Sequence, residues 1–562
     1  MSLPTAGQLS RRGFIAASVA GGFALAACNQ NRKRTPDEKM AAAIAAAEAA
    51  RPHTGRTVTA TLTPAPATID IGGPIVHTLA YGNTIPGQVI RATIGDEVVV
   101  TVKNQLDHPT SVHWHGITLR NDMDGAAPAT PNIGAGEEFT YRFSVPDAGT
   151  YWAHPHTGLD ADMGLYLPVI VDNPTEHFRY DAEWIVVLDD WTDGVGKSPQ
   201  QLYDALRDPN KPPMSMPPAA PSSPTPTSPA TSTTPTKTSG TTSTSPTTST
   251  SPTTTTSPRT STTSTSPTST TSPAMPGMPG EPAGPGGDVG TSDLLGGDAG
   301  DIAYPYYLVN GRIPTAPTSF TEAKPGQRIR IRIINVASDT AFRVALAGHS
   351  MTVTHTDGYP VIPTQVDALL IGMAERYDVV VTAADGVFPL VAAAAGKNAV
   401  ARALLTTGAG SAPDPQFRPA ELTKRVGTVD TFIAATTVNL GRPEPNLDLP
   451  VVLGGNMEKY EWTINGQPYS STVPLQIREG QRPTLAFDNT TMMYHPIHLH
   501  GHTFQVIKAD GGPGPRKDTV IVLPKQKLRA VLVADNPGVW QMHCHNTYHQ
   551  EAGMQTRLDY VF

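Results

Sequence analysis

The stretch HCHNTYH, residues 543–549, brings three imidazoles and one thiol together, and Met554 follows five residues later. In a β-strand, alternate side chains face the same way. His543 and His545 would therefore share one face, while Cys544 points to the opposite face. This tripeptide can supply ligands to two different metal sites, one on each side of a strand.

Three further histidine clusters lie upstream of this stretch. They are HWHG at residues 113–116, HPH at residues 154–156 and HPIHLHGH at residues 495–502. Of the 17 histidines in the chain, 11 fall within these four stretches, which scattered core or surface histidines would not do. One His-x-His pair is a weak signal, whereas four sets, one with a central Cys and a trailing Met, indicate bound metal.

Strand periodicity divides these ligands into two groups, because His498 and His500 share a face while His495, an odd step away, can be turned from them. Two imidazoles with a thiolate and a thioether are typical of a blue-copper electron-transfer centre, whereas zinc usually takes a Cys/His set without Met. Eight imidazoles exceed the needs of one ion and fit a copper cluster that reacts with dioxygen. The first group is His495, Cys544, His549 and Met554, and the second is His113, His115, His154, His156, His498, His500, His543 and His545.

These motifs resemble those of the multicopper oxidases, in particular the bacterial three-domain laccases and cuprous oxidases. The segments INGQ at residues 464–467 and KDTV at residues 517–520 also resemble bacterial members. The resemblance implies an all-β chain of three cupredoxin-like Greek-key β-sandwich domains. It places a trinuclear copper cluster between the first and last domains and a blue copper in the last.

The resemblance also implies four copper ions and assigns their ligands position by position. Donor electrons would enter one at a time at the type 1 copper, cross Cys544 to its neighbours His543 and His545, and reduce dioxygen to two waters at the cluster. The type 1 copper would take His495, Cys544, His549 and the axial Met554; type 2 would take His113 and His498; and the type 3 pair would take His115, His154, His156, His500, His543 and His545.

Oxygen reduction consumes protons, and two acidic residues are candidates to supply them. Asp124 follows His113 by eleven residues and matches the family's carboxylate near the type 2 ligands. It would deliver protons or orient those ligands, although Asp-Met-Asp-Gly also reads as a simple turn. Bacterial relatives often carry an acid directly after the last type 1 histidine, but here that residue is Gln550. Either Glu551 substitutes for that acid, or the proton path differs.

The axial Met favours a lower potential and therefore donors that are easily oxidised, namely Cu(I), Fe(II) and electron-rich phenols. We expect an oxidase of Cu(I) that serves copper detoxification, with phenols as additional donors. One alternative is a laccase that acts chiefly on phenols. Another, of a different class, is a non-catalytic copper-binding or scaffold protein, which the complete ligand set disfavours. A monomer is expected. A two-domain copper nitrite reductase fits poorly, since it would need a trimer and would lack paired histidine clusters at both ends of one chain.

The N-terminus predicts export. Ser10-Arg11-Arg12 precedes a short apolar run and resembles a twin-arginine signal over residues 1–27. The run ends in LAAC, residues 25–28, which resembles a bacterial lipobox, so we expect lipidation of Cys28 and attachment to the outer face of the cytoplasmic membrane. The alternative is a soluble secreted protein. Residues 28–55 read as a tether, in which residues 40–50 can form a short helix.

The sequence pattern of the rest of the chain is typical of β-strands, apart from one Ser/Thr/Pro-rich segment that we call the spacer. Short runs rich in β-branched residues recur between turn residues, as at 98–102 and 329–333, and argue for sandwiches. The spacer is almost wholly Ser, Thr and Pro over residues 221–273, which lack the apolar surface to order it. We expect domains at 56–175, 176–415 and 416–562, with a disordered insertion at about 205–300. Flanking methionines at 214, 216, 275 and 278 can capture Cu(I) or be incidental.

Composition excludes other classes. The net charge of −8 gives no electrostatic footprint for nucleic acid. A Cys count of 2 excludes a disulfide framework. No apolar run long enough for a transmembrane helix follows the N-terminus.

Overall fold

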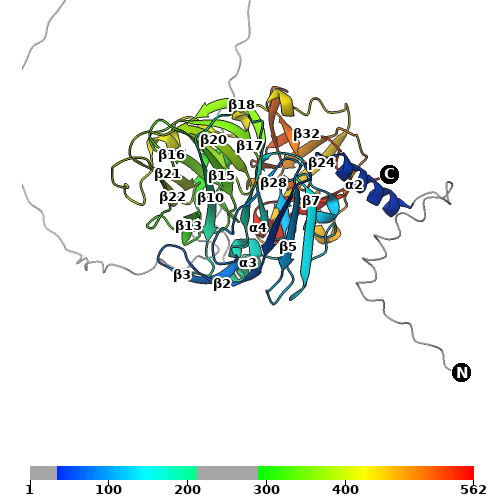
Figure 1. The fold of residues 1–562 in the computed structure, drawn as a ribbon. Coiled ribbons are helices and arrows are strands. Elements are labelled where there is room, and N and C mark those ends of the chain that lie inside the picture. The colour runs from blue at the N-terminus through cyan, green and yellow to red at the C-terminus, as the bar shows by residue number, and fades with distance from the viewer. Residues whose placement is uncertain (1–34, 177, 212–288) are drawn as a thin grey trace, which may run out of the picture. The chain divides into compact units, whose positions relative to one another are not determined.

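The computed structural model describes residues 35–176, 178–211 and 289–562. Strands dominate these ranges (Figure 1), which also hold three α-helices: α2 (Pro36–Ala50), α3 (Pro199–Arg207) and α4 (Thr547–Glu551). None of the helices in the described ranges is long and apolar enough to cross a membrane. The export signal, Cys28, residues 221–273 and the four methionines beside them lie outside the described residues.

The first β-sandwich is built from strands with alternating burial. In β5 the side chains of Val98, Val100 and Val102 are buried, and the residues between them are not. The two sheets have the strand orders β1-β5-β7 and β4-β9-β8-β6 and share one apolar core, and β2 and β3 form a separate two-stranded sheet. The strands are β1 (Thr57–Leu62), β2 (Pro64–Asp70), β3 (Ile75–Tyr81), β4 (Ile90–Thr93), β5 (Glu97–Lys103), β6 (His113–His115), β7 (Glu138–Ser144), β8 (Gly149–His154) and β9 (Leu167–Asp172).

The second β-sandwich has two six-stranded sheets, in the orders β13-β10-β15-β20-β17-β18 and β14-β22-β21-β16-β19-β23. Strand β23 lies beyond the expected domain boundary at residue 415, yet pairs with β19 of this sandwich. The strands of these sheets are β10 (Ala182–Trp191), β13 (Tyr306–Val309), β14 (Ser319–Phe320), β15 (Arg328–Asn335), β16 (Phe342–Leu346), β17 (Met351–Thr356), β18 (Tyr359–Val366), β19 (Ala368–Ile371), β20 (Arg376–Thr382), β21 (Val387–Ala394), β22 (Val400–Thr406) and β23 (Val426–Gly427). A separate two-stranded sheet is formed by β11 (Thr291–Ser292) and β12 (Gly297–Asp298).

The third β-sandwich ends the chain, with sheet orders β25-β24-β27-β32-β29-β30 and β26-β34-β33-β28-β31. Its strands are β24 (Asp448–Asn456), β25 (Glu461–Ile464), β26 (Leu475–Ile477), β27 (Thr484–Asn489), β28 (His495–Leu499), β29 (Phe504–Ile507), β30 (Pro513–Lys517), β31 (Thr519–Val522), β32 (Lys527–Leu532), β33 (Val539–Cys544) and β34 (Gln555–Tyr560). Single-turn 3-10 helices are η1 (Asn121–Met123), η2 (Asp160–Met163), η3 (Asp293–Leu295), η4 (Ala420–Thr423), η5 (Val429–Thr431), η6 (Thr436–Val438) and η7 (Tyr469–Ser471).

The expected insertion at 205–300 is wrong at both flanks. Residues 205–207 complete helix α3, whose Leu202 and Leu206 lie one turn apart and are buried. At the other flank, β11 and β12 pair around η3, and Leu295 is buried. These isolated leucines supply apolar surface for packing against the body, which the spacer's composition lacks.

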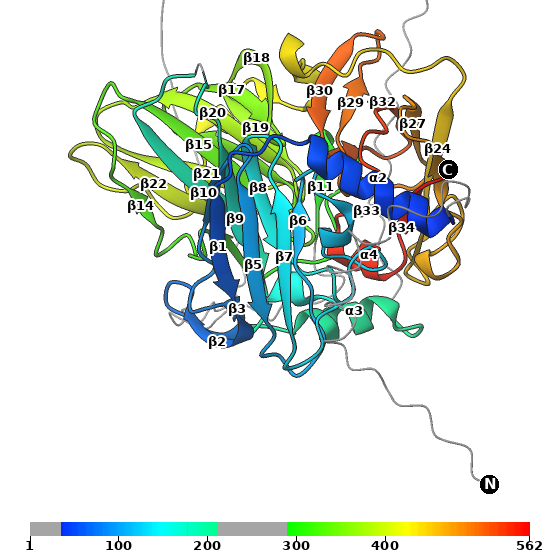
Figure 2. The same ribbon diagram turned by 45° about the vertical axis from the view of Figure 1, so that its right-hand side comes forward.

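The expected tether at 28–55 is also wrong from residue 35 onward, because helix α2 is bound to the body. A capping box between Thr35 and Glu38 begins the helix. At its end, Arg51 donates to the Thr118 main-chain oxygen of the first sandwich and to Asn536 Oδ1 of the third, the latter at 3.0 Å. Figure 2 shows α2 lying across the strands in front, near the C-terminus. Arg51, the C-cap residue of the helix, therefore contacts both the first and the last sandwich.

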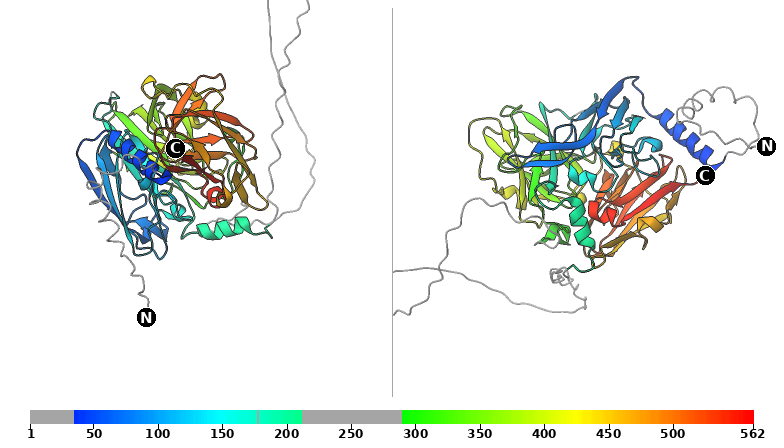
Figure 3. Two further views of the ribbon diagram at one scale, coloured as in Figure 1. Left: turned by 90° about the vertical axis from the view of Figure 1, so that its right-hand side faces the viewer. Right: turned by 90° about the horizontal axis from the view of Figure 1, so that it is seen from below.

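Strand pairing aligns the histidine clusters. In the first sandwich β6 and β8 are antiparallel, with His113 opposite His154. In the third, β28 and β33 are antiparallel, with His498 opposite His543. The right-hand view in Figure 3, from below, shows red segments of the third sandwich beside cyan segments of the first. The first and the third sandwich thus each contribute one antiparallel pair of histidine-bearing strands.

Candidate metal centre

The eight histidines of the second ligand group meet in one buried cluster between the first and third sandwiches. Each histidine of the first sandwich has a close partner from the third. The distances between ring centroids are 3.7 Å for His113–His500, 3.7 Å for His115–His498, 5.1 Å for His154–His545 and 4.8 Å for His156–His543. The structure therefore brings together all eight residues that the sequence singled out.

Fixed oxygen atoms determine which ring nitrogens can bind a metal. His113 Nδ1 lies 2.9 Å from the Asp124 main-chain oxygen, and His498 Nδ1 lies 2.9 Å from that of Asp518. Since these oxygens only accept hydrogen bonds, each Nδ1 carries the hydrogen and each Nε2 keeps its lone pair. Both of these Nε2 atoms are buried and, within the described residues, have no hydrogen-bond partner.

The Nε2 atoms of His500 and His543 indicate that a cation binds between them. His500 Nδ1 donates to Asp124 Oδ2 at 2.9 Å, and His543 Nδ1 donates to the Cys544 main-chain oxygen at 3.0 Å. Their Nε2 atoms, both left with lone pairs, face each other at 3.1 Å. Two acceptors at that distance repel unless a positive ion lies with them, so the cluster fits bound metal.

The second site contains the thiol. Cys544 Sγ lies 3.7 Å from the Nδ1 atoms of His495 and His549, which are 3.1 Å apart. The other nitrogen of His549 faces Asp301 Oδ2 at 2.9 Å, so its Nδ1 keeps a lone pair. One thiol and two imidazole nitrogens in this arrangement suit copper.

Burial disfavours the protonated, charged form of the cluster histidines, which leaves their ring nitrogens available to bind metal. Loss of solvent, with added repulsion from neighbouring imidazoles, lowers the pKa of most of the histidines and keeps them neutral, as metal ligands must be. Burial also raises the pKa of the Cys544 thiol, so a metal is needed to hold it as thiolate. The histidines with a lowered pKa are His115, His154, His156, His495, His498, His500, His543 and His545.

The segment after Cys544 folds back onto the site. Asn546 caps α4, and its side-chain oxygen accepts from the backbone N–H of Tyr548 and His549. The Met554 N–H donates to the His549 oxygen at 2.9 Å, and the Cys544 N–H donates to the Met554 oxygen at 3.0 Å. The Met554 side chain is fully buried. Its role as axial ligand stays a prediction.

Asp124 lies at the cluster and is not only a turn residue. Its side chain contacts His500, and its main-chain oxygen contacts His113. Gly125 makes the approach possible, because it has φ +84° and a Cβ there would lie 1.8 Å from the Val112 oxygen. One acidic residue thus touches ligands from two sandwiches.

Glu551 lines a cavity of about 480 Å³. The same cavity is lined by His156 of the cluster and by Gln550. Burial, with a smaller contribution from the Asp160 carboxylate, raises the pKa of Glu551 to about 7. The structure therefore places Glu551, Gln550 and one cluster histidine on the wall of the same cavity.

Sequence reasoning missed three residues around the sites. Asp301 contacts His549, the Trp462 ring lies 4.1 Å from the His549 ring, and Asp518 Oδ1 lies 3.1 Å from His115 Nε2. The KDTV segment was the only signal for Asp518, and nothing near Asp301 in the sequence pointed to a site.

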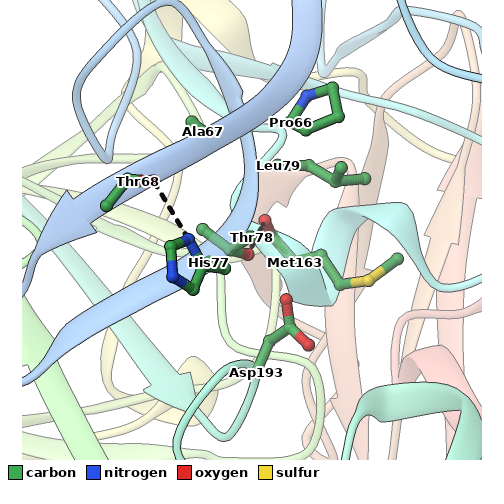
Figure 4. A pocket seen from close by; sticks show the side chains of 8 residues that line it. All are labelled: Pro66, Ala67, Thr68, His77, Thr78, Leu79, Met163 and Asp193. Carbon is green, nitrogen blue, oxygen red and sulfur yellow. Dashed lines mark hydrogen bonds between the residues drawn. The ribbon is translucent and has the colours of Figure 1, made fainter.

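Other histidines stay out of the clusters. His502 follows the third cluster in sequence, but its Nε2 bonds the Tyr560 hydroxyl at 2.8 Å, which is strand packing. A surface pocket of 390 Å³ (Figure 4) contains His77, Met163 and Asp193, and His77 Nδ1 pairs with Thr68 Oγ1 at 3.0 Å. None of the residues lining this pocket belongs to either cluster.

Comparisons with known proteins agree with this geometry. Residues 66–176, 289–410 and 442–561 each match a family model described as multicopper oxidase. The chain is 68% identical to multicopper oxidase MmcO of Mycobacterium tuberculosis, over 99% of this chain and 97% of that protein. It is 27% identical to a copper resistance protein A homolog of Pseudomonas syringae pv. tomato, over 86% of this chain and 89% of the relative.

Among solved structures, the laccase from Botrytis aclada matches with a TM-score of 0.64 at 22% identity, over 91% of this chain and 89% of the laccase. That likeness confirms the expected all-β fold of three cupredoxin-like sandwiches. The family matches imply that the buried histidine clusters bind copper. The chain belongs to the multicopper oxidase family and is an oxidoreductase of that family.

Proposed function

We propose that this protein oxidises Cu(I) in one-electron steps, with Fe(II) and phenols as additional donors, and couples this to four-electron reduction of dioxygen to water. The observation that carries the proposal is the position of Cys544. Its Sγ belongs to the site with His495 and His549, while the adjacent His543 and His545 belong to the eight-histidine cluster. One tripeptide thus joins an electron entry site to an oxygen-reducing site through covalent bonds.

The residues would hold four copper ions as the family pattern assigns them. Bound copper supplies one-electron redox chemistry at both sites. Type 1 would be held by His495, Cys544, His549 and Met554; type 2 by His113 and His498; and the type 3 pair by His115, His154, His156, His500, His543 and His545. The protein holds these groups in a buried, water-poor interior, and Asp124 orients His500 and His113 from outside the ligand set.

Two carboxylates beside the type 1 residues, the buried Asp301 and the partly buried Asp298, support a cationic donor. Asp301 accepts from His549 Nε2 and, at 2.6 Å, from the Tyr460 hydroxyl, while its second oxygen is buried without a hydrogen-bond partner in the described ranges. A backbone bridge joins Asp298 to Met493. Carboxylates attract cations, so these two residues favour Cu(I) or Fe(II) over a neutral phenol.

A thioether side chain, which is a soft metal ligand, is exposed close to Asp298. Met492 is 42% exposed, whereas its neighbour Met493 is buried in the core. Met492 follows Thr491, whose hydroxyl lies 2.8 Å from His495 Nε2. Thioethers prefer Cu(I), so Met492 is suited to meet this donor near the type 1 site.

The donor proposal predicts a selective effect at Met492. Met492→Leu keeps the side chain's bulk but removes the sulfur, so kcat/KM for Cu(I) should fall roughly tenfold, equivalent to about 1.4 kcal/mol. kcat/KM for a methoxyphenol should not change. Oxygen uptake with each donor measures both, and Met163→Leu, which removes a thioether from the pocket in Figure 4, serves as the control.

The same assay separates the alternatives. Rapid turnover of phenols without added copper, together with no turnover of Cu(I), would establish the laccase alternative. Copper-loaded protein that is colourless and consumes no oxygen would establish the non-catalytic copper-binding alternative. Equal effects of Met492→Leu on both donors would remove Met492 from the donor site.

The cavity that contains His156 and Glu551 supports a role for Glu551 in proton delivery. Glu551→Gln keeps the shape but removes the exchangeable proton, so oxygen reduction should slow by about 10²-fold, the lower end of what proton transfer contributes. Reduction of the blue copper by donor should keep its rate. Stopped-flow absorption measures both steps, with the exposed Glu479→Gln as control. Reoxidation of Glu551→Gln at the wild-type rate would assign the protons to another path.

Location forms part of the proposal. The resemblance of residues 1–27 to a twin-arginine signal and of residues 25–28 to a lipobox supports export and attachment to the outer face of the cytoplasmic membrane. The similarity to a copper resistance protein supports a task in copper detoxification outside the cytoplasm. Mass spectrometry of the mature N-terminus tests whether Cys28 is lipidated.

A further inference from the structure

A buried ion pair brings the second sandwich to the eight-histidine cluster. Arg376 begins β20 and donates to both carboxylate oxygens of Asp518, with Nη1–Oδ1 at 2.7 Å and Nη2–Oδ2 at 2.6 Å. Neither side chain is exposed. A guanidinium that engages both oxygens fixes the plane of the carboxylate as well as its position.

Asp518, held by Arg376, in turn contacts two cluster histidines. Its Oδ1 lies 3.1 Å from His115 Nε2, and its main-chain oxygen lies 2.9 Å from His498 Nδ1. Because the carboxylate only accepts, His115 carries its hydrogen on Nε2 and keeps a lone pair on Nδ1. That Nδ1 is buried and has no hydrogen-bond partner in the described part of the chain. His115 thus presents the opposite ring nitrogen from His498.

The chain leaves room for this pair directly after His115. A Cβ on Gly116 would lie 2.4 Å from Arg376 Nη2 and 2.6 Å from Asp518 Oδ2, and the residue has φ +85°. Any other residue would push the pair away from the histidine. Gly116 comes from the first sandwich, Arg376 from the second and Asp518 from the third.

Further contacts hold both partners in place. Arg376 Nε donates to the Thr150 oxygen at 3.0 Å, and Thr519 Oγ1 donates to Asp518 Oδ1 at 2.8 Å. Asp357 accepts from the Arg376 N–H at 2.9 Å and from the Asp518 N–H at 3.2 Å. The position of the Asp518 carboxylate is therefore fixed by Arg376 and Thr519, and that of its backbone by Asp357.

We propose that Arg376 is a positioning residue for the oxygen-reducing cluster. It holds Asp518 so that His115 presents Nδ1 and His498 presents Nε2 to copper. The inference rests on the proposed function and extends it, because the second sandwich supplies none of the assigned copper ligands. In this arrangement that sandwich sets the orientation of one type 3 and one type 2 ligand.

Arg376→Met, Arg376→Lys and Asp518→Asn test the inference in the full, copper-loaded chain. The matched control is Arg332→Met. Arg332 is also buried, on the neighbouring β15, and donates to Asp378 Oδ2 at 3.1 Å and Thr150 Oγ1 at 2.9 Å. Within the described ranges, none of its hydrogen bonds goes to a cluster histidine. The readouts are copper per chain, the electron paramagnetic resonance signal of type 2 copper, the type 3 absorption and the blue absorption.

Arg376→Met and Asp518→Asn should lose cluster copper to a chelator about 10–100-fold faster than wild type, as for other changes behind metal ligands. The blue absorption should persist. Arg376→Lys keeps the charge without the two-pronged contact and should fall between wild type and Arg376→Met. Arg332→Met should keep all copper signals.

Two results would overturn the inference: Arg376→Met retaining cluster copper as firmly as wild type, or Arg332→Met losing it equally fast. If Arg376→Met fails to fold, Arg376→Lys decides, since retention of cluster copper at the wild-type rate contradicts the positioning role. A wild-type protein that binds no cluster copper at all would instead defeat the proposed function, so the two failures are distinct.

Discussion

Replacing Cys544 by Ser is expected to abolish turnover with every donor while the eight-histidine cluster still binds copper. Cys544 Sγ lies 3.7 Å from both Nδ1 atoms of its site and is fully buried. A hydroxyl is a poor ligand for soft copper and offers no thiolate path to the adjacent imidazoles. Oxygen uptake should drop to the level of copper-free protein, and the blue absorption should vanish.

Copper analysis separates this loss from unfolding. Cys544→Ser should bind one copper per chain fewer than wild type and keep the type 2 resonance signal. The chain's other cysteine offers a matched control, since Cys28→Ser in purified protein should turn over normally. Turnover by Cys544→Ser comparable to wild type would refute the shared-ligand arrangement.

Replacing Asp124 by Asn is expected to slow reoxidation by dioxygen by about 10²–10⁴-fold, the range for a lost proton-transfer group. Asp124 Oδ2 accepts from His500 Nδ1 at 2.9 Å, and its main-chain oxygen accepts from His113 Nδ1 at 2.9 Å. An amide keeps much of the shape but can neither release a proton as a carboxylic acid does nor accept through both side-chain atoms. Reduction of the blue copper by donor should proceed at the wild-type rate, because Asp124 has no contact with that site in the described residues.

Stopped-flow absorption resolves the two half-reactions of the Asp124 variant. Asp122→Asn is the control, since that residue lies two positions earlier and pairs at 2.6 Å with Arg120 near the surface. Asp124→Glu, which keeps an acid, should recover part of the rate. If Asp124→Asn reoxidises as fast as wild type, Asp124 does not deliver the protons.

Local spacing predicted which copper-site side chains come together, because strand alternation is a short-range property. Cys544 faces His495 and His549, and its two neighbours face the cluster, as periodicity requires. The same periodicity correctly turned His495 away from His498. Export, lipidation and the spacer depend on residues outside the described ranges and stay predictions.

Long-range contacts could not be predicted in this way. Asp301 meets His549 across 248 residues of sequence, and Arg376 meets Asp518 across 142. No motif marks Asp301 or Arg376, because the docking of whole sandwiches brings them to their partners. The spacer boundaries failed for a related reason, since Leu202 and Leu295 pack against distant parts of the fold.

The cluster takes half of its imidazoles from the beginning of the fold and half from its end. A nascent chain that still lacks β33, or a molecule clipped ahead of it, holds no thiol ligand and an incomplete set of nitrogens. We expect such fragments to be unable to assemble the complete cluster. The eight-histidine site therefore forms only when the first and last sandwiches are both present and docked.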